Sequence, residues 1–266
     1  MQMKAATILT VLWSFCWMIQ SIAGNPVIHK PSEMRQSAGY GPPLTEAEFN
    51  CIPTFGKSAT HHNYSLGNDI MPFPGKHAKL RSKWPSNFIP YEIDSTFDAK
   101  GRCAIANTMN AFHKHTCIRF YPRKDEVDYV QINRLNETGF RCYTLGIGYS
   151  EKIGAHTVYL TPACYNSETG TVVHELMHRV GFRHEHTRPD RDNYINIIWA
   201  NIDPKGHAQY SIPTDSELIL SYDYGSVMHY PLGDSMTAKN NVKLAKIGQR
   251  YGLSKLDIMK LNRMYC

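Results

Sequence analysis

Long basic runs are missing from this sequence, although its formal net charge is +6 over 266 residues. Acidic residues interrupt the basic ones, as in the stretch RPDRD at 188–192. A nucleic-acid-binding domain usually carries a continuous basic patch or stripe, so this class is disfavoured. Only the stretch from Asp234 to Cys266 is lopsided, with seven Lys and Arg residues against two Asp. This weak signal would suit an acidic substrate or surface.

A membrane-spanning apolar run is also missing from the amino end of the chain. The apolar run Ala5–Ile19 follows Lys4 and is shorter than the roughly 20 residues that a spanning helix needs. Small residues follow it at Ser21–Gly24. This order of charged, apolar and small residues predicts a cleaved secretory signal peptide over residues 1–24. A membrane anchor is the alternative, but polar residues dilute the apolar run.

Cysteine is scarce, at seven of 266 positions, and Cys16 would leave with the signal peptide. The remaining even number, in an exported chain, predicts disulfides rather than free thiols. Spacing alone does not choose among the many possible pairings. The six remaining cysteines are Cys51, Cys103, Cys117, Cys142, Cys164 and Cys266.

Residues 25–76 are rich in Pro, Gly and polar residues, and prolines break most helices. We expect an extended segment that lies on another part of the chain, with a plain linker as the alternative. From Trp84 onwards the apolar spacing becomes regular. Strands and helices first and loops later predict an α+β domain. The expected strands are 88–94, 117–122, 127–135, 142–149 and 155–160, and the expected helices are 102–115, 169–180 and 253–265.

Histidine is scarce too, yet four of the 13 histidines fall in one stretch, HELMHRVGFRHEH at 174–186. His174 and His178 are four residues apart, so both imidazoles lie on one face of a helix and can reach one metal ion. Glu175 would lie beside the metal, where a carboxylate can take a proton from metal-bound water. For H-E-x-x-H alone, an amphipathic helix with surface histidines is the alternative.

A third metal ligand cannot come from the same straight helix, because the helix face rotates away from the metal. Gly181 lets the backbone turn, and His184 follows three residues later. The result is H-E-x-x-H-x-x-G-x-x-H, the long signature of metzincins. Three neutral imidazoles leave a position open for water, which is typical of catalytic zinc. Downstream, SVMHY at 226–230 is consistent with a Met-turn centred on Met228.

The chain resembles the astacin family of zinc metalloendopeptidases, which belongs to the metzincin clan. The resemblance covers roughly Trp84 to Cys266 and rests on HELMHRVGFRHEHTRPDRD (174–192), SVMHY, TCIRF (116–120) and IGQRYGLSKLDIMKLNRMYC (247–266). It implies a zincin-like α+β fold with a twisted N-terminal sheet, an active-site helix, a less regular C-terminal half and a cleft between the halves. It also implies one Zn²⁺ per chain, held by His174, His178 and His184.

The resemblance implies further roles for single residues. Tyr230, which ends the Met-turn, would be an additional zinc ligand that swings away to help bind the transition-state oxyanion. Glu185 would pair with the ammonium group of the mature N-terminus. The strand that begins at Cys142 would form the upper edge of the cleft and pair with an extended substrate. The implied disulfides are Cys117–Cys266 and Cys142–Cys164.

An inhibitory pro-segment at 25–76, ahead of a catalytic domain at 77–266, is also implied. In the family, the aspartate of an F-x-G-D motif ligates zinc and displaces the water. The corresponding stretch here is LGNDI at 66–70, which makes Asp69 the candidate ligand. Leu66 replaces the aromatic residue and Asn68 the glycine, so a plain turn aspartate is the alternative.

Two further features concern activation and export. An activating protease would cut between Asp69 and Trp84. The family pattern leaves Cys51 and Cys103 without partners; they could bond to each other and tether the pro-segment. N-x-S/T acceptors for glycans are found at Asn63 and Asn136.

Together these features predict a secreted zinc endopeptidase, made as a zymogen, that hydrolyses extracellular proteins by zinc-activated water with Glu175 as the general base. The expected partners are an extended polypeptide substrate, the chain's own pro-segment and an activating protease. Neither nucleic acid nor, after signal removal, a membrane is expected as a partner. The rival function is a proteolytically inactive relative that binds proteins in the cleft. No zinc ligand or base is missing, which disfavours that rival.

Overall fold

The computed structural model describes residues 39–53, 69–71, 83–137, 141–167, 169–214, 216–239 and 247–266. The chain divides into two compact units, Met1–Arg35 and Gln36–Cys266, and every described residue belongs to the second. The predicted signal peptide and the acceptor Asn63 lie outside the described residues. No helix within the described ranges is long and apolar enough to cross a membrane.

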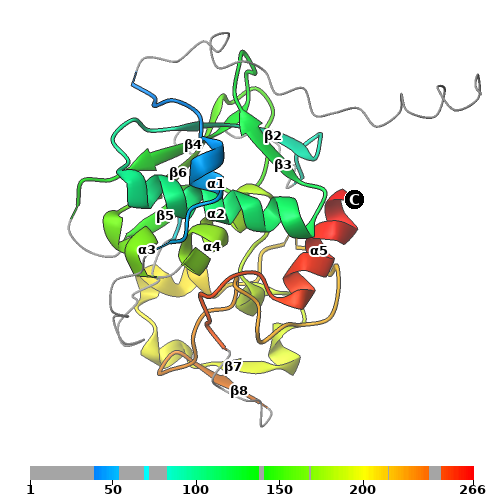
Figure 1. Cartoon of the computed structure of the whole chain (residues 1–266). Helices are drawn as coiled ribbons and strands as arrows, with labels where there is room; N and C mark the ends of the chain where they lie inside the picture. The colour runs from blue at the N-terminus through cyan, green and yellow to red at the C-terminus, as the bar shows by residue number, and fades with distance from the viewer. Residues whose placement is uncertain are drawn as a thin grey trace, which may run out of the picture. The chain divides into compact units, whose positions relative to one another are not determined.

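Six strands form one sheet in the described chain (Figure 1). They are β1 (Ile70–Met71), β2 (Phe88–Ile93), β3 (Arg119–Pro122), β4 (Tyr129–Arg134), β5 (Cys142–Leu145) and β6 (Ala155–Leu160). Their order across the sheet is β1-β5-β6-β4-β2-β3. Strand β5 runs antiparallel to β6, whereas all other neighbouring pairs are parallel. The short β1 therefore covers the outer edge of β5.

Three helices pack around this sheet: α2 (Ala99–His115), α3 (Pro162–Ser167) and α4 (Thr169–Arg179). Helix α2 places Ile105, Met109 and Phe112 on one buried face, as their helical spacing predicts. These side chains share a hydrophobic core with sheet residues such as Ile89 and Val130. The last helix, α5 (Lys255–Tyr265), lies beside the carboxyl end of α2 (Figure 1), where Asn262 Nδ2 donates to the His115 carbonyl at 3.1 Å.

The chain after α4 is less regular. It contains the 3₁₀ helices η2 (Glu185–Thr187), η3 (Arg191–Asn193), η4 (Trp199–Asn201) and η5 (Pro204–Gln209). Strands β7 (Ile195–Ile197) and β8 (Met236–Ala238) pair antiparallel. A sheet-rich first half followed by a looser second half confirms the predicted α+β class.

The predicted strands and helices are confirmed, with shorter bounds at several ends. Strand β5 stops at Leu145 rather than at the expected position 149, because Gly146 and Gly148 adopt positive φ angles of 72° and 60°. The sequence did not predict α3, β7, β8 or the single turn α1 (Glu46–Phe49). The turn α1 is closed by a capping box between Thr45 and Glu48.

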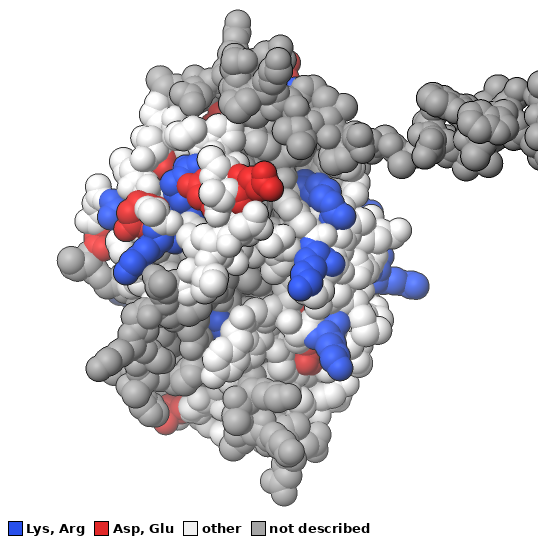
Figure 2. Space-filling view, viewed as in Figure 1, with Lys and Arg blue, Asp and Glu red and all other residues white. Residues whose placement is uncertain are grey.

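Residues 39–53 lie against α2 and the sheet, as expected for an extended segment that rests on another part of the chain. Arg102 of α2 forms an ion pair with Glu48, and its guanidinium also donates to the carbonyls of Pro42 and Pro43. Leu44 is buried in the hydrophobic core. Charged side chains on the face in Figure 2 are dispersed, with basic groups either set apart or beside acidic ones.

Candidate metal centre and active site

Helix α4 presents His174 and His178 on one face, and both side chains are fully buried. The Nδ1 atom of His174 donates to the Val227 carbonyl at 2.8 Å, and that of His178 to the Phe182 carbonyl at 2.7 Å. Burial lowers the pKa of His174 well below its usual range and that of His178 to about 4. Both rings are therefore neutral, and their Nε2 lone pairs point away from the backbone.

The helix ends in a turn that depends on Gly181, which has a φ angle of 104°. Gly181 N donates to the His178 carbonyl and Phe182 N to the Met177 carbonyl, the pattern of a Schellman motif. The turn returns the chain toward the helix face, so that His184 Nε2 lies 3.2 Å from His178 Nε2. The same distance separates the Nε2 atoms of His178 and His174.

Asp69 joins this cluster from the short β1 segment. Its backbone carbonyl accepts a hydrogen bond from Thr144 N of β5 at 2.7 Å, which places its side chain in the site. Its Oδ2 atom lies 3.1 Å from His174 Nε2 and 2.9 Å from His184 Nε2. One ligand atom from each of Asp69, His174, His178 and His184 lies within 4.8 Å of the other three.

The donor set fits zinc. The Nε2 atoms of His174 and His178 have no proton to share, so they cannot hydrogen-bond to each other at 3.2 Å. Lone pairs directed at one another repel unless a cation lies between them. Zinc–nitrogen bonds of about 2.0–2.1 Å in a tetrahedron place ligand atoms about 3.3 Å apart, which agrees with the 3.2 Å from His178 Nε2 to each of the other two histidine nitrogens.

Glu175 follows His174 on α4 and is almost completely buried. Its Oε2 atom has no hydrogen-bond partner among the described residues. Burial raises the pKa of Glu175 well above its usual range, and the nearby Asp69 raises it further. A raised pKa makes the ionised form of Glu175 a stronger base, and its unused oxygen can accept a proton from a reactant beside the metal.

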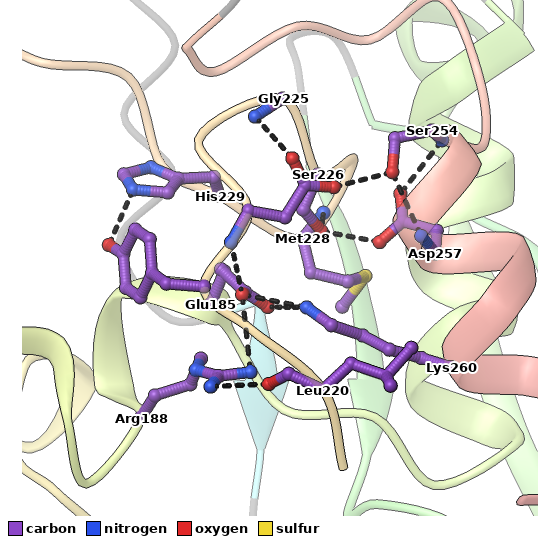
Figure 3. Close-up of polar contacts among 12 residues, drawn as sticks. Glu185, Arg188, Leu220, Gly225, Ser226, Met228, His229, Ser254, Asp257 and Lys260 are labelled. Carbon is purple, nitrogen blue, oxygen red and sulfur yellow. Dashed lines mark hydrogen bonds and ion pairs between the residues drawn. The ribbon is translucent and has the colours of Figure 1, made fainter. Parts of the chain in front are cut away.

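The predicted Met-turn lies against the histidine cluster. The Val227 carbonyl orients His174, and the Met228 carbonyl accepts from Glu185 N at 3.0 Å. Helix α5 holds this turn, because Asp257 accepts from Ser226 Oγ at 2.6 Å (Figure 3). Asp257 also accepts from Val227 N at 2.9 Å. Sequence reasoning did not assign Asp257 a role.

Tyr230 ends the turn with its ring between two histidines. Its ring centroid lies 4.4 Å from that of His184 and 4.1 Å from that of His186. Its hydroxyl donates to Asp69 Oδ1 at 2.9 Å. In this structure the predicted extra zinc ligand therefore binds the candidate inhibitory aspartate.

The partner of Glu185 in the described structure is Lys260 of α5, whose Nζ lies 2.7 and 2.8 Å from the two carboxylate oxygens. Burial raises the pKa of Glu185, and the charge of Lys260 offsets part of this effect. The resemblance assigns the mature N-terminus to this position, and residues 72–82, which precede Lys83, lie outside the described residues. Sequence reasoning missed Lys260, because it lies 75 residues from Glu185 and no local spacing links the two.

Three disulfides join distant segments. Cys117–Cys266 connects the chain just before β3 to the C-terminus, and Cys142–Cys164 connects β5 to α3. These are the pairs that the resemblance implies. The third pair, Cys51–Cys103, links the segment before residue 54 to α2.

Comparison with known proteins agrees with this geometry. The family model of the astacin peptidases matches residues 76–266. Zinc metalloproteinase nas-4 of Caenorhabditis elegans is 31% identical, over 98% of this chain and 90% of that protein. Zinc metalloproteinase nas-13 of the same organism is 39% identical over 69% of this chain, but the chain spans only 41% of that longer protein.

A solved structure shares the fold. High choriolytic enzyme 1, a hatching enzyme zinc-protease from the medaka fish Oryzias latipes, superposes with a TM-score of 0.60 at 32% identity. The match covers 71% of this chain and 97% of that structure. The family match over residues 76–266, the identity to nas-4 along nearly the whole chain and the buried three-histidine cluster lead to one conclusion. This chain belongs to the astacin family of zinc metalloendopeptidases.

Proposed function

We propose that this zinc metalloendopeptidase is secreted and made as an inactive zymogen, and that it cleaves extended polypeptides with Glu175 as the general base. The observation that carries the proposal is the convergence of three histidine nitrogens and one Asp69 oxygen near Glu175, whose Oε2 atom has no hydrogen-bond partner among the described residues. The three histidine nitrogens support zinc binding, and the unpartnered oxygen of Glu175 supports its role as the base. The presence of Asp69 in the same cluster supports latency.

His174, His178 and His184 would hold the zinc, which when bound acts as a Lewis acid that polarises the scissile carbonyl and lowers the pKa of water. Glu175 would accept the proton of the attacking water and deliver it to the leaving amine. The Tyr230 hydroxyl, once freed from Asp69, would donate a hydrogen bond to the developing oxyanion. The carbonyls of Val227 and Phe182 would keep the ring nitrogens of two ligands fixed during turnover.

Strand β5 would bind the substrate along its outer edge. That edge has backbone groups that accept a strand, because β1 already pairs with it at Ile70–Thr144 and Met71–Leu145. An extended polypeptide placed there would lie next to the histidine cluster, as Asp69 does. The same edge cannot hold β1 and a substrate together.

Latency would arise from the segment that contains Asp69. Its carboxylate lies among the three histidines and accepts from Tyr230, so it uses the groups that a substrate carbonyl and a water would need. A cut by an activating protease between Asp69 and Trp84 would let Asp69 move out of the histidine cluster. We propose the boundaries 25–76 for the pro-segment and 77–266 for the catalytic domain, and the family model begins at residue 76.

Export is supported by the signal-like residues 1–24 and by three disulfides, which persist in oxidising compartments. Asn136, one of the two glycan acceptors, is exposed. These features agree with a glycosylated extracellular protein.

Metal removal tests the proposed function directly. We expect the activated protein to digest casein, to lose this activity when 1,10-phenanthroline removes the zinc, and to regain it when zinc is added back. A protein that retains zinc but cleaves neither casein nor gelatin would instead be an inactive protein-binding relative. Proteolysis that continues after metal analysis shows the zinc to be gone would contradict the mechanism.

The Cys51–Cys103 bond predicts that the cut pro-segment stays attached to the enzyme. After activation, we expect one band on a non-reducing gel and two bands after reduction, because the bond crosses the cleavage region. The Cys51→Ser/Cys103→Ser variant should release the fragment without reductant. A tethered fragment has an effective concentration on the order of millimolar, so the wild type should also be less active than the variant after gel filtration. Fragment release from unreduced wild type would disprove the tether.

A further inference from the structure

Glu185, the residue after the third histidine, has a complete set of partners within the described fold. Both carboxylate oxygens bind Lys260 Nζ, at 2.7 and 2.8 Å. Oε1 also accepts from Asp223 N at 2.8 Å and lies 3.5 Å from Arg188 Nη1. The side chains of Lys260 and Glu185 are only 4% and 7% exposed, so the ion pair is almost entirely shielded from solvent.

Arg188, the second cation beside Glu185, is shared with another carboxylate. Arg188 also binds Asp190, at 2.9 Å through Nε and 3.0 Å through Nη2. Two cations, Lys260 and Arg188, therefore face two anions, Glu185 and Asp190. Each cation of this cluster therefore has a carboxylate partner, and each carboxylate has a cation.

Helix α5 contacts both chain segments that carry or orient zinc ligands. Lys260 binds Glu185, the residue next to His184, and Asp257, one helical turn earlier, binds Ser226 of the Met-turn (Figure 3). Asp257 also binds Val227 N. Val227 orients His174 through its carbonyl. Lys260 and Asp257 of α5 therefore support His184 and His174 indirectly, through Glu185 and Val227.

We propose that Lys260 is a positioning residue for the zinc site and serves as the built-in counter-ion of Glu185. By fixing the Glu185 side chain, it holds the backbone of His184 against the Met-turn, where Glu185 N already donates to Met228. The alignment of His184 then does not need the ammonium group of a freed N-terminus. This inference rests on the proposed function, because it concerns the same metal centre after activation.

The experiment combines a lysine variant with an N-terminus that lacks a charge. Activated enzyme is prepared as wild type, Lys260→Met, Lys260→Arg and Lys255→Met, the last being an exposed lysine on the same helix. Each is also made with a first mature residue of Gln that has cyclised to pyroglutamate, which removes the ammonium group. The measurements are kcat, KM and zinc retention against a chelator.

We expect Lys260→Met to lower kcat or zinc affinity by about 10- to 100-fold, as for other groups that orient metal ligands, with KM within about twofold. Lys260→Arg should recover part of the loss, and Lys255→Met should match wild type. The pyroglutamate form of the wild type should keep its kcat. The measurement on the pyroglutamate form of the wild type does not depend on how well Lys260→Met folds.

The opposite pattern would overturn the proposal. A pyroglutamate N-terminus that abolishes kcat, with Lys260→Met as active as Lys255→Met, would make the N-terminal ammonium the partner that matters. If the wild type bound zinc but cleaved no protein, the proposed function would fail while zinc retention would still decide the role of Lys260. In that case equal zinc retention by Lys260→Met and Lys255→Met would reject it.

Discussion

Replacing Glu175 with Gln in the activated enzyme is expected to lower kcat by about 100- to 10,000-fold while zinc stays bound. The amide has nearly the shape of the carboxylate, but it cannot accept the proton of the attacking water. Glu175 contributes no atom to the four-ligand cluster, which consists of Asp69 and the three histidines. The loss should therefore appear in catalysis and leave metal binding intact.

The measurement is steady-state hydrolysis of a quenched fluorescent peptide, with zinc quantified in the same samples. Glu151→Gln is the matched control, because Glu151 is an exposed carboxylate of the same chain. Glu175→Gln with near-normal kcat and a full complement of zinc would refute its role as the base. A variant that had lost its zinc would show that the residue supports the metal site instead.

Local spacing was enough to predict the central helices and the histidine cluster. Helix α2 was recognised from its buried face, although its true start at Ala99 lies in a polar first turn that the apolar pattern does not mark. His174, His178 and His184 lie within eleven residues, so one helix face and one glycine turn place them together. The three-residue strands β7 and β8 were missed, because so short a run has too few residues to show alternation.

Long-range polar pairs were not predictable from spacing. Lys260 lies 75 residues from Glu185 and Asp257 lies 31 from Ser226, and nothing in the local pattern of either helix or turn specifies such a partner. Asp69, 105 residues before His174, was found only through the family resemblance. Its contacts depend on β1 pairing with β5, and a two-residue strand leaves almost no periodic signal.

The pairing of β1 with β5 holds Asp69 in the site before any cut. The role of Asp69 is therefore tested in the uncut protein. Replacing Asp69 with Ala should raise the peptidase activity of the uncut chain by at least about tenfold over the uncut wild type. A buried hydrogen bond to a charged group contributes about 1.5–3 kcal/mol, and about 1.4 kcal/mol corresponds to a factor of ten. Asp69 accepts one such bond from the Tyr230 hydroxyl at 2.9 Å, and the variant also removes its oxygen from the ligand cluster.

Glu46→Ala is the matched control, because Glu46 is an exposed acidic residue of the same amino-terminal segment and makes no contact with the histidine cluster. Activity is measured on a short peptide, which needs little of the β5 edge, and a reducing gel verifies that the chain remains uncut. Zinc is quantified before and after, because the alanine also removes one of the four ligand atoms. If uncut Asp69→Ala stayed as inactive as uncut wild type while its cleaved form worked normally, latency would come from the occupied β5 edge rather than from the carboxylate. Activity in the uncut variant would instead show that a single aspartate, held by two residues of strand pairing, keeps the centre closed.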